Sequence, residues 1–172
     1  MKIPYGLSNF KNIISEGYLY IDKTAYIETL EQEGSFNILL RPRRFGKSLF
    51  LSTLWHYYDI RSKDAFEGLF GRLAIGKNPT PLQNSYQILF MEFSGISIKD
   101  EESIERDFAF EVSGRLRNFL EEYQYPAEDQ ELFSAIVGKG GFVRSFYETI
   151  KTATMEGIVG LGSNFGQIYS SG

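Results

Sequence analysis

The chain of 172 residues contains no cysteine and only one histidine. Without thiols the protein can form no disulfide and cannot use thiolate catalysis or cysteine metal ligands, and this composition suits a reducing cytosol. One histidine also makes a multi-histidine metal site or a Ser-His-Asp triad hard to build. No apolar run approaches the ~20 residues of a membrane span, and no continuous apolar stretch follows the first residues, as a signal peptide would require. We therefore expect a cytoplasmic protein without a membrane segment.

Aromatic residues and one local cluster of positive charge stand out in the sequence. The length suits one well-buried domain and is too short for two large ones. With 15 Phe and 11 Tyr, we expect a phenylalanine-rich core rather than a surface that stacks on bases. The net charge of −4 disfavours nonspecific binding of nucleic acid by the whole surface. The local exception is a group of four cations, Arg41, Arg43, Arg44 and Lys47.

These cations lie in a strand–loop–helix pattern. The apolar run at residues 36–40 predicts a short buried strand, and apolar residues at helical spacing from Leu49 to Tyr58 predict a helix. Between them stands Gly46-Lys47-Ser48. A strand, a tight loop, Gly-Lys-Ser and a helix form the context that a phosphate-binding P-loop, or Walker A motif, requires.

The chemistry of such a loop is local. The first amides of a helix have no partner within the helix and lie at the positive end of its dipole, so that they attract phosphate. Gly46 lets the backbone approach the phosphates, Lys47 is the expected catalytic cation at the β- and γ-phosphates, and Ser48 is the expected Mg²⁺ ligand. We expect the whole loop to bind nucleotide: Arg41, Pro42, Arg43, Arg44, Phe45, Gly46, Lys47, Ser48 and Leu49.

One position departs from the usual P-loop pattern. Arg41 occupies the place where that pattern begins with glycine. The alternative interpretation is an ordinary strand-to-helix turn that contains Gly-Lys-Ser. The flanking strand and helix favour the P-loop.

The remaining elements predict an α/β protein. Residues 88–94 form a second buried strand candidate, and apolar residues at helical spacing predict a long amphipathic helix over 102–123. Ser8 is a candidate cap for a first helix that Gly17 ends, and Asp22 is a candidate cap for a second, or positions a nucleotide or a nearby loop. We read residues 71–87 as a loop and the Gly-rich residues 138–141 as a turn rather than a second phosphate site.

Three stretches of the sequence resemble the bacterial AAA-ATPase-like proteins, which often carry a C-terminal PD-(D/E)XK nuclease-like domain. These stretches are Ile3-Pro4-Tyr5-Gly6, the run from Gly17 to Thr24, and above all Arg41-Pro42-Arg43-Arg44-Phe45-Gly46-Lys47-Ser48-Leu49. The resemblance covers Met1 to about Ile96, and residues 138–157 look like a more distal helix. It implies ATP and Mg²⁺ as ligands, explains arginine at the first loop position, and implies a three-layer α/β/α P-loop NTPase-like fold with a small, mostly parallel sheet.

The chain also departs from this family. A Walker B strand, four apolar residues ending in Asp-Glu, is not found, and no nuclease-like domain follows, so that the chain resembles a shortened N-terminal portion with an incomplete sheet. Glu92 ends an apolar run and is a second, less specific candidate for the Mg²⁺ shell. Since phosphoryl transfer also needs a held metal and a positioned water, we expect ATP binding with weak or absent hydrolysis.

The predicted organisation is one AAA-ATPase-like P-loop domain at residues 1–157 and an irregular tail at 158–172. An alternative function is a nonenzymatic interaction module whose Arg/Lys-rich loop binds another anion, such as nucleic-acid phosphate. A third possibility is a chain that folds poorly because a central strand is missing. The pattern does not distinguish ATP from GTP, and it specifies neither a macromolecular partner nor an oligomeric state.

Overall fold

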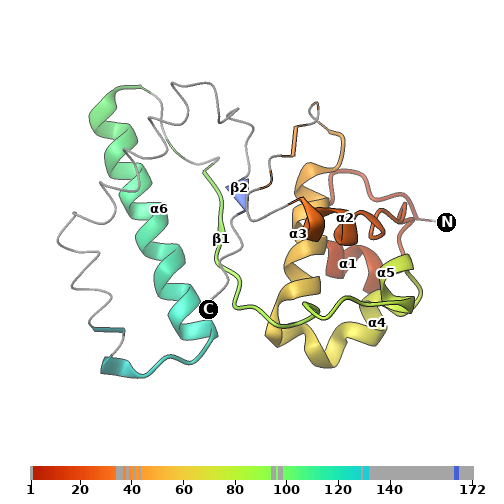
Figure 1. Cartoon of the computed structure of the whole chain (residues 1–172). Helices are drawn as coiled ribbons and strands as arrows, with labels where there is room; N and C mark the ends of the chain where they lie inside the picture. The colour runs from red at the N-terminus through yellow and green to blue at the C-terminus, as the bar shows by residue number, and fades with distance from the viewer. Residues whose placement is uncertain are drawn as a thin grey trace. The chain divides into compact units, whose positions relative to one another are not determined.

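A computed structural model describes residues 2–33, 37, 39–40, 42, 44–93, 96, 99–128, 130–131 and 165–166. These residues fall into two compact units, one ending at Ile88 and the other beginning at Leu89 (Figure 1). The described helices of the first unit are α1 (Phe10–Ser15), α2 (Tyr26–Gln32), α3 (Lys47–Tyr58), the 3₁₀ helix η1 (Ile60–Ala65), α4 (Phe66–Phe70) and α5 (Ala74–Lys77). The second unit contains β1 (Phe90–Met91), α6 (Glu101–Glu122) and β2 (Phe165–Gly166).

The first helix begins one residue later than its predicted cap implies. The cap is Asn9 rather than Ser8, and its side-chain oxygen accepts a hydrogen bond from the Asn12 amide at 3.1 Å. Gly17 follows the helix with a φ of 70°, a left-handed conformation that glycine adopts without steric cost. The predicted end of this helix is therefore confirmed, and its start is shifted by one position.

Aromatic side chains form much of the core of the first unit. Phe10, Tyr57 and Phe70 are fully buried. The ring centroids of Phe10 and Phe70 lie 4.8 Å apart. Those of Tyr57 and Phe70 lie 5.6 Å apart, in an edge-to-face arrangement. Such ring pairs add to the free energy gained by burying their area. The expected phenylalanine-rich core is confirmed for this unit.

The N-terminal segment is attached to α3, the helix that follows the predicted P-loop. Helix α1 packs on α3, and the Phe10 amide donates a buried hydrogen bond to the Ser52 hydroxyl at 3.0 Å. Further along, the Tyr20 and Thr53 hydroxyls lie 3.3 Å apart. Two polar residues of α3 thus satisfy groups of the N-terminal segment that burial would otherwise leave without partners.

The second unit is built around α6, which matches the helix predicted at 102–123. The Asp100 side chain accepts a hydrogen bond from the Ser103 amide at 2.8 Å and caps the helix. Phe108, Val112 and Leu116 are buried and form its core face. Their spacing is the 3.6-residue period from which the helix was predicted.

Strand structure is much shorter than the sequence suggests. Among the described residues 88–93 of the predicted strand at 88–94, only Phe90–Met91 is a strand, and it pairs antiparallel with Phe165–Gly166 from the predicted irregular tail. Of the predicted strand at 36–40, the described residues Asn37, Leu39 and Leu40 have no strand assignment, and Leu40 is 71% exposed. An apolar run becomes a buried strand only where neighbouring strands pair with it, and no described residue pairs with this one. The described part of the chain is therefore mostly helical.

Candidate phosphate-binding site

The loop before α3 contains two residues with left-handed backbone conformation. Arg44 has a φ of 67° and Gly46 a φ of 77°, both left-handed. Gly46 is the N-cap of α3, and Lys47 and Ser48 are the first two residues of the helix. A left-handed residue directly before a helix turns successive amides toward one side, which makes a concave anion site.

Lys47 bridges this loop. Its Nζ atom donates a hydrogen bond to the Pro42 carbonyl at 3.0 Å, and both Lys47 and Ser48 are half-buried. The Gly46 carbonyl accepts from the Phe50 amide at 2.9 Å, which closes the first helical turn. The ammonium group of Lys47 therefore lies against the backbone of the loop at Pro42.

The structure describes most, but not all, of the predicted nucleotide-binding residues. Pro42, Arg44, Phe45, Gly46, Lys47, Ser48 and Leu49 lie together in the loop and the first turn of α3. Phe45 is 62% exposed. Arg41 and Arg43 lie outside the described residues, as do residues 138–157. Glu92 follows β1 in the second unit and is half-buried; its role as a Mg²⁺ ligand stays a prediction.

Asp22 positions a loop instead of capping the next helix. Helix α2 has Ala25 at its N-cap and no side-chain cap. Asp22 Oδ1 accepts from the Thr24 amide and hydroxyl at 2.8 and 2.7 Å, and Oδ2 accepts from the Ala74 amide at 2.7 Å. Partial burial acts to raise the pKa of Asp22, but these hydrogen bonds outweigh it and lower the pKa. The predicted cap of α2 is wrong, and the alternative of a loop-positioning role holds.

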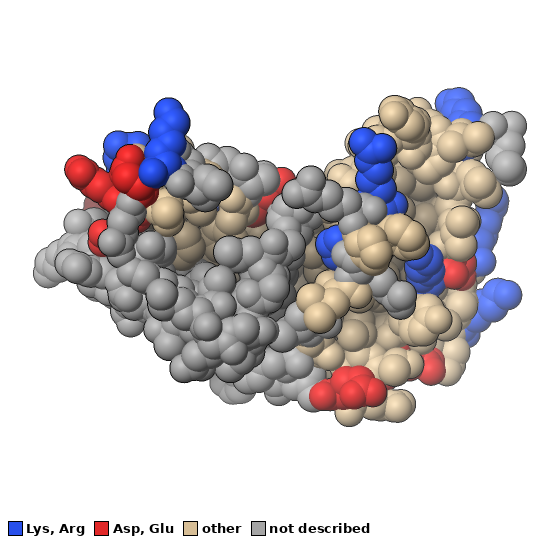
Figure 2. Space-filling view, turned by 90° about the horizontal axis from the view of Figure 1, so that it is seen from above, with Lys and Arg blue, Asp and Glu red and all other residues tan. Residues whose placement is uncertain are grey.

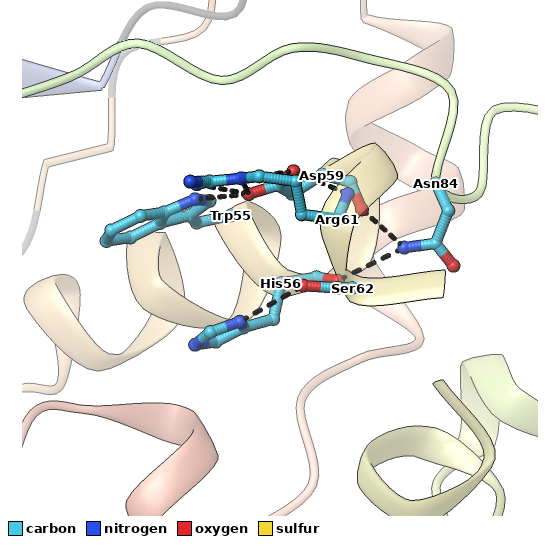
Figure 3. Close-up of polar contacts among 6 residues, drawn as sticks. All are labelled: Trp55, His56, Asp59, Arg61, Ser62 and Asn84. Atoms are coloured by element: carbon cyan, nitrogen blue, oxygen red, sulfur yellow. Dashed lines mark hydrogen bonds and ion pairs between the residues drawn. The ribbon is translucent and has the colours of Figure 1, made fainter. Parts of the chain in front are cut away.

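The opposite end of α3 carries a polar cluster around a buried carboxylate (Figure 3). Asp59 is 2% exposed. It accepts from the Trp55 indole at 2.9 Å and forms an ion pair with Arg61 at 2.8 Å. Burial alone would raise the pKa of Asp59, but the bonds from Arg61 and Trp55 lower it. This cluster fixes the direction in which the chain leaves α3.

Asn84 closes the C-terminal end of α3 from a distant part of the chain. Its side-chain amide donates to the Asp59 carbonyl at 2.8 Å, and its own backbone N–H donates to the Tyr57 carbonyl at 2.9 Å. Asn84 has a φ of 47°, a conformation that asparagine tolerates better than most residues. It therefore provides partners for carbonyls that the helix end leaves unsatisfied.

We expect Asn84→Ala to destabilise the first unit by about 2–3 kcal/mol, since it loses the hydrogen bonds of the side chain, of which that to the Asp59 carbonyl is the shortest, and forces alanine into a left-handed conformation. Asn84→Gly removes the same hydrogen bonds without the backbone strain, and about 1 kcal/mol is expected. Urea denaturation of both variants measures the difference. Equal losses in the two variants would show that the left-handed conformation carries no cost.

The Asp59 cluster and Asn84 were not singled out from the sequence. One nearby signal was that Asp59 lies four residues after Trp55, a spacing at which side chains meet on a helix. The other was that Asp59 lies two residues before Arg61, the spacing at which an Asp side chain accepts from the backbone in an Asx turn. For Asn84 no local signal existed, because its acceptors lie about 25 residues earlier in the chain.

Comparison with known proteins places this chain in a family. The family described as predicted AAA-ATPases matches residues 4–156, and the chain belongs to it. A protein of Azotobacter chroococcum mcd 1, described as an uncharacterized protein in the vnfD 5′ region, is 34% identical over 109 residues. That match covers 63% of this chain and 20% of the relative, so the chain matches only about a fifth of that protein's length. No solved structure matches the chain.

Across the part of the chain that the structure describes, no helix combines the length and apolarity needed to cross a bilayer. Among the same residues, no three His, Cys, Asp or Glu side chains are grouped closely enough to hold a metal ion.

Proposed function

We propose that the chain binds ATP with Mg²⁺ through the loop at residues 41–49. The observation that carries this proposal is the left-handed Gly46 directly before a 12-residue helix whose first residues are Lys47 and Ser48. Membership of the predicted AAA-ATPase family supports it. In this arrangement the first amides of α3 and the Lys47 ammonium group face the same anion.

The amides, the cations and the hydroxyl of the loop have separate roles in binding. The amides after Gly46 bind the β-phosphate, Lys47 places its charge at the β- and γ-phosphates, and Ser48 contributes its hydroxyl to Mg²⁺. Arg41, Arg43 and Arg44 add positive charge around the triphosphate. Bound Mg²⁺ would neutralise charge on the phosphates.

Binding is proposed to proceed with weak or absent hydrolysis. The sequence offers no Walker B acidic pair, and Glu92 is the acidic candidate for the metal shell. Equal binding of the ground state and the transition state gives no rate increase. We further propose a single cytoplasmic P-loop domain at residues 1–157 with a three-layer α/β/α arrangement and a small, mostly parallel sheet, followed by a tail at 158–172.

Isothermal titration of Mg²⁺-ATP into the full chain tests the proposal. We expect saturable binding to one site that weakens when Mg²⁺ is chelated, because Ser48 and the metal act together. Titration of Mg²⁺-GTP under the same conditions measures base preference. The proposal would be overturned if the protein unfolds cooperatively, and is therefore folded, but shows no saturable binding at millimolar Mg²⁺-ATP.

The second candidate function is binding of nucleic-acid phosphate by the same loop. Its support is the concentration of four cations between Arg41 and Lys47. On the face drawn in Figure 2, the described lysines and arginines lie as separate spots rather than as a continuous patch. Four phosphate contacts to a duplex would give a slope of log K against log salt of about −3.6, and indifference to Mg²⁺ would distinguish this function in the same titrations.

A further inference from the structure

A hollow of about 200 Å³ lies in the first unit, where α1, α3, η1 and α4 meet. Its polar lining comes from Lys11 on α1, from His56 on α3, and from Asp59, Arg61 and Ser62 around η1. Trp55, Ala65 and Leu69 complete it. The volume corresponds to roughly six water molecules, which suits a small ligand group.

Aromatic rings and a hydroxyl define one side of this hollow. The Trp55 and His56 rings are parallel, with centroids 5.7 Å apart and planes 2° apart. His56 Nδ1 lies 3.4 Å from the Ser62 hydroxyl (Figure 3). The side-chain atoms of His56 are thus oriented by two neighbours rather than rotating freely.

The charge in the hollow is positive on balance. Asp59 contributes the one carboxylate of the lining, and it is occupied by donors from Trp55 and Arg61. Arg61 keeps 32% of its side chain exposed, and Lys11 is exposed. The lining of the hollow therefore contains two cations and one anion, and the anion is buried and already hydrogen-bonded.

The surroundings of His56 act on its pKa. Burial lowers the pKa first, and the positive charges of Lys11 and Arg61 lower it further, while Asp59 acts in the opposite direction. This direction favours the neutral imidazole, which carries one N–H donor.

We propose that this hollow binds an oxyanion, the phosphate or carboxylate group of a small ligand, at a site separate from the P-loop. Lys11 and Arg61 supply the charge. The hydrogen-bonded pair of His56 and Ser62 supplies one neutral donor, which is the His56 Nε2–H or the Ser62 hydroxyl according to the imidazole tautomer. His56 lies nine residues after Lys47 on the same helix, a separation of about 13 Å along the axis. One anion cannot occupy both places.

The chain contains one tryptophan and one histidine, and both line the hollow, so each gives a signal that needs no labelling. The experiment titrates sodium phosphate, and separately sodium acetate, into the Lys47→Ala variant of the full chain, with sodium chloride at matched ionic strength as reference. Removing Lys47 suppresses binding at the P-loop, so the result does not depend on the proposed nucleotide function.

We expect saturable changes in Trp55 fluorescence and in the His56 ring signals by NMR with at least one of the two anions. The pKa of His56, followed by NMR, is expected to rise on binding because a bound anion favours the charged imidazolium. A response to phosphate alone or to acetate alone identifies which oxyanion class the site takes. Changes no larger than those caused by chloride, up to high millimolar anion, would overturn the proposal.

Two lysine variants locate the response. Lys11→Gln, added to the Lys47→Ala background, is expected to weaken binding roughly two- to fivefold, the effect of removing one exposed charge pair. Lys23→Gln removes the same charge from an exposed position that does not line the hollow, and it is expected to leave binding unchanged. If both variants weaken binding equally, or neither does, the anion is not bound in this hollow.

Discussion

Replacing Lys47 with alanine is expected to abolish the stabilisation that Mg²⁺-ATP gives to the wild-type protein. A ligand present at 100 times its Kd stabilises the folded state by about 2.7 kcal/mol. For a protein of this size each kcal/mol raises the melting temperature by roughly 2–4 °C. The wild type should therefore shift by about 5–11 °C, and Lys47→Ala should show little or no shift. The reason is that Lys47 carries a full charge at the triphosphate, where the amides of α3 carry only partial charges.

The control for this experiment is Lys23→Ala, which removes an exposed lysine of the same unit that is not one of residues 41–49. It should keep the full shift. The melting temperature without ligand should be nearly the same in all three proteins, because the contact of Lys47 with the Pro42 carbonyl lies at a half-exposed site. A full ATP shift in Lys47→Ala would show that the nucleotide binds elsewhere.

Phe10→Ala is expected to cause the largest loss of stability in the first unit. Phe10 is fully buried, and its ring contacts Tyr20 at 5.3 Å and Phe70 at 4.8 Å between centroids. Truncating a buried phenylalanine to alanine costs about 3–5 kcal/mol through lost burial and the cavity that remains. This corresponds to a fall of roughly 6–20 °C in melting temperature. Native proteins are stable by about 5–15 kcal/mol, so the loss is a large part of the total.

Tyr5→Ala is the matched control, because Tyr5 is an aromatic residue of the same N-terminal segment and is 91% exposed. Its removal should change the free energy of unfolding by less than about 0.5 kcal/mol. Urea denaturation followed by circular dichroism measures both variants. Similar small effects in the two would mean that the N-terminal segment does not pack on α3 in solution.

Sequence periodicity and composition predicted the features that depend on residues close together in the chain or on overall composition. The helix from Lys47 was expected because apolar residues recur at helical spacing after Gly46, and the structure begins α3 at Lys47. Helix α6 was expected over 102–123 for the same reason and spans Glu101–Glu122. The aromatic core followed from composition, since phenylalanine is among the residues that are most often buried.

Other features depended on contacts between distant parts of the chain. Asp22 could cap α2 or hold a loop, and the position of Ala74, 52 residues away, decided between them. Apolar runs at 36–40 and 88–94 predicted strands, but a strand needs a paired neighbour, and the described residues provide such pairing only for Phe90–Met91.

The sequence by itself therefore determined the family and the helix that follows Gly46, and it gave the prediction of a phosphate-binding loop at 41–49, because each rests on residues adjacent in the chain. The tertiary structure alone decided the partners of Asp22 and Asn84 and the gathering of Lys11, His56 and Arg61 around one hollow. Hydrogen bonds and charge interactions act over a few ångströms in space. Their partners can be separated by tens of residues, and no local pattern records which residues folding will bring together.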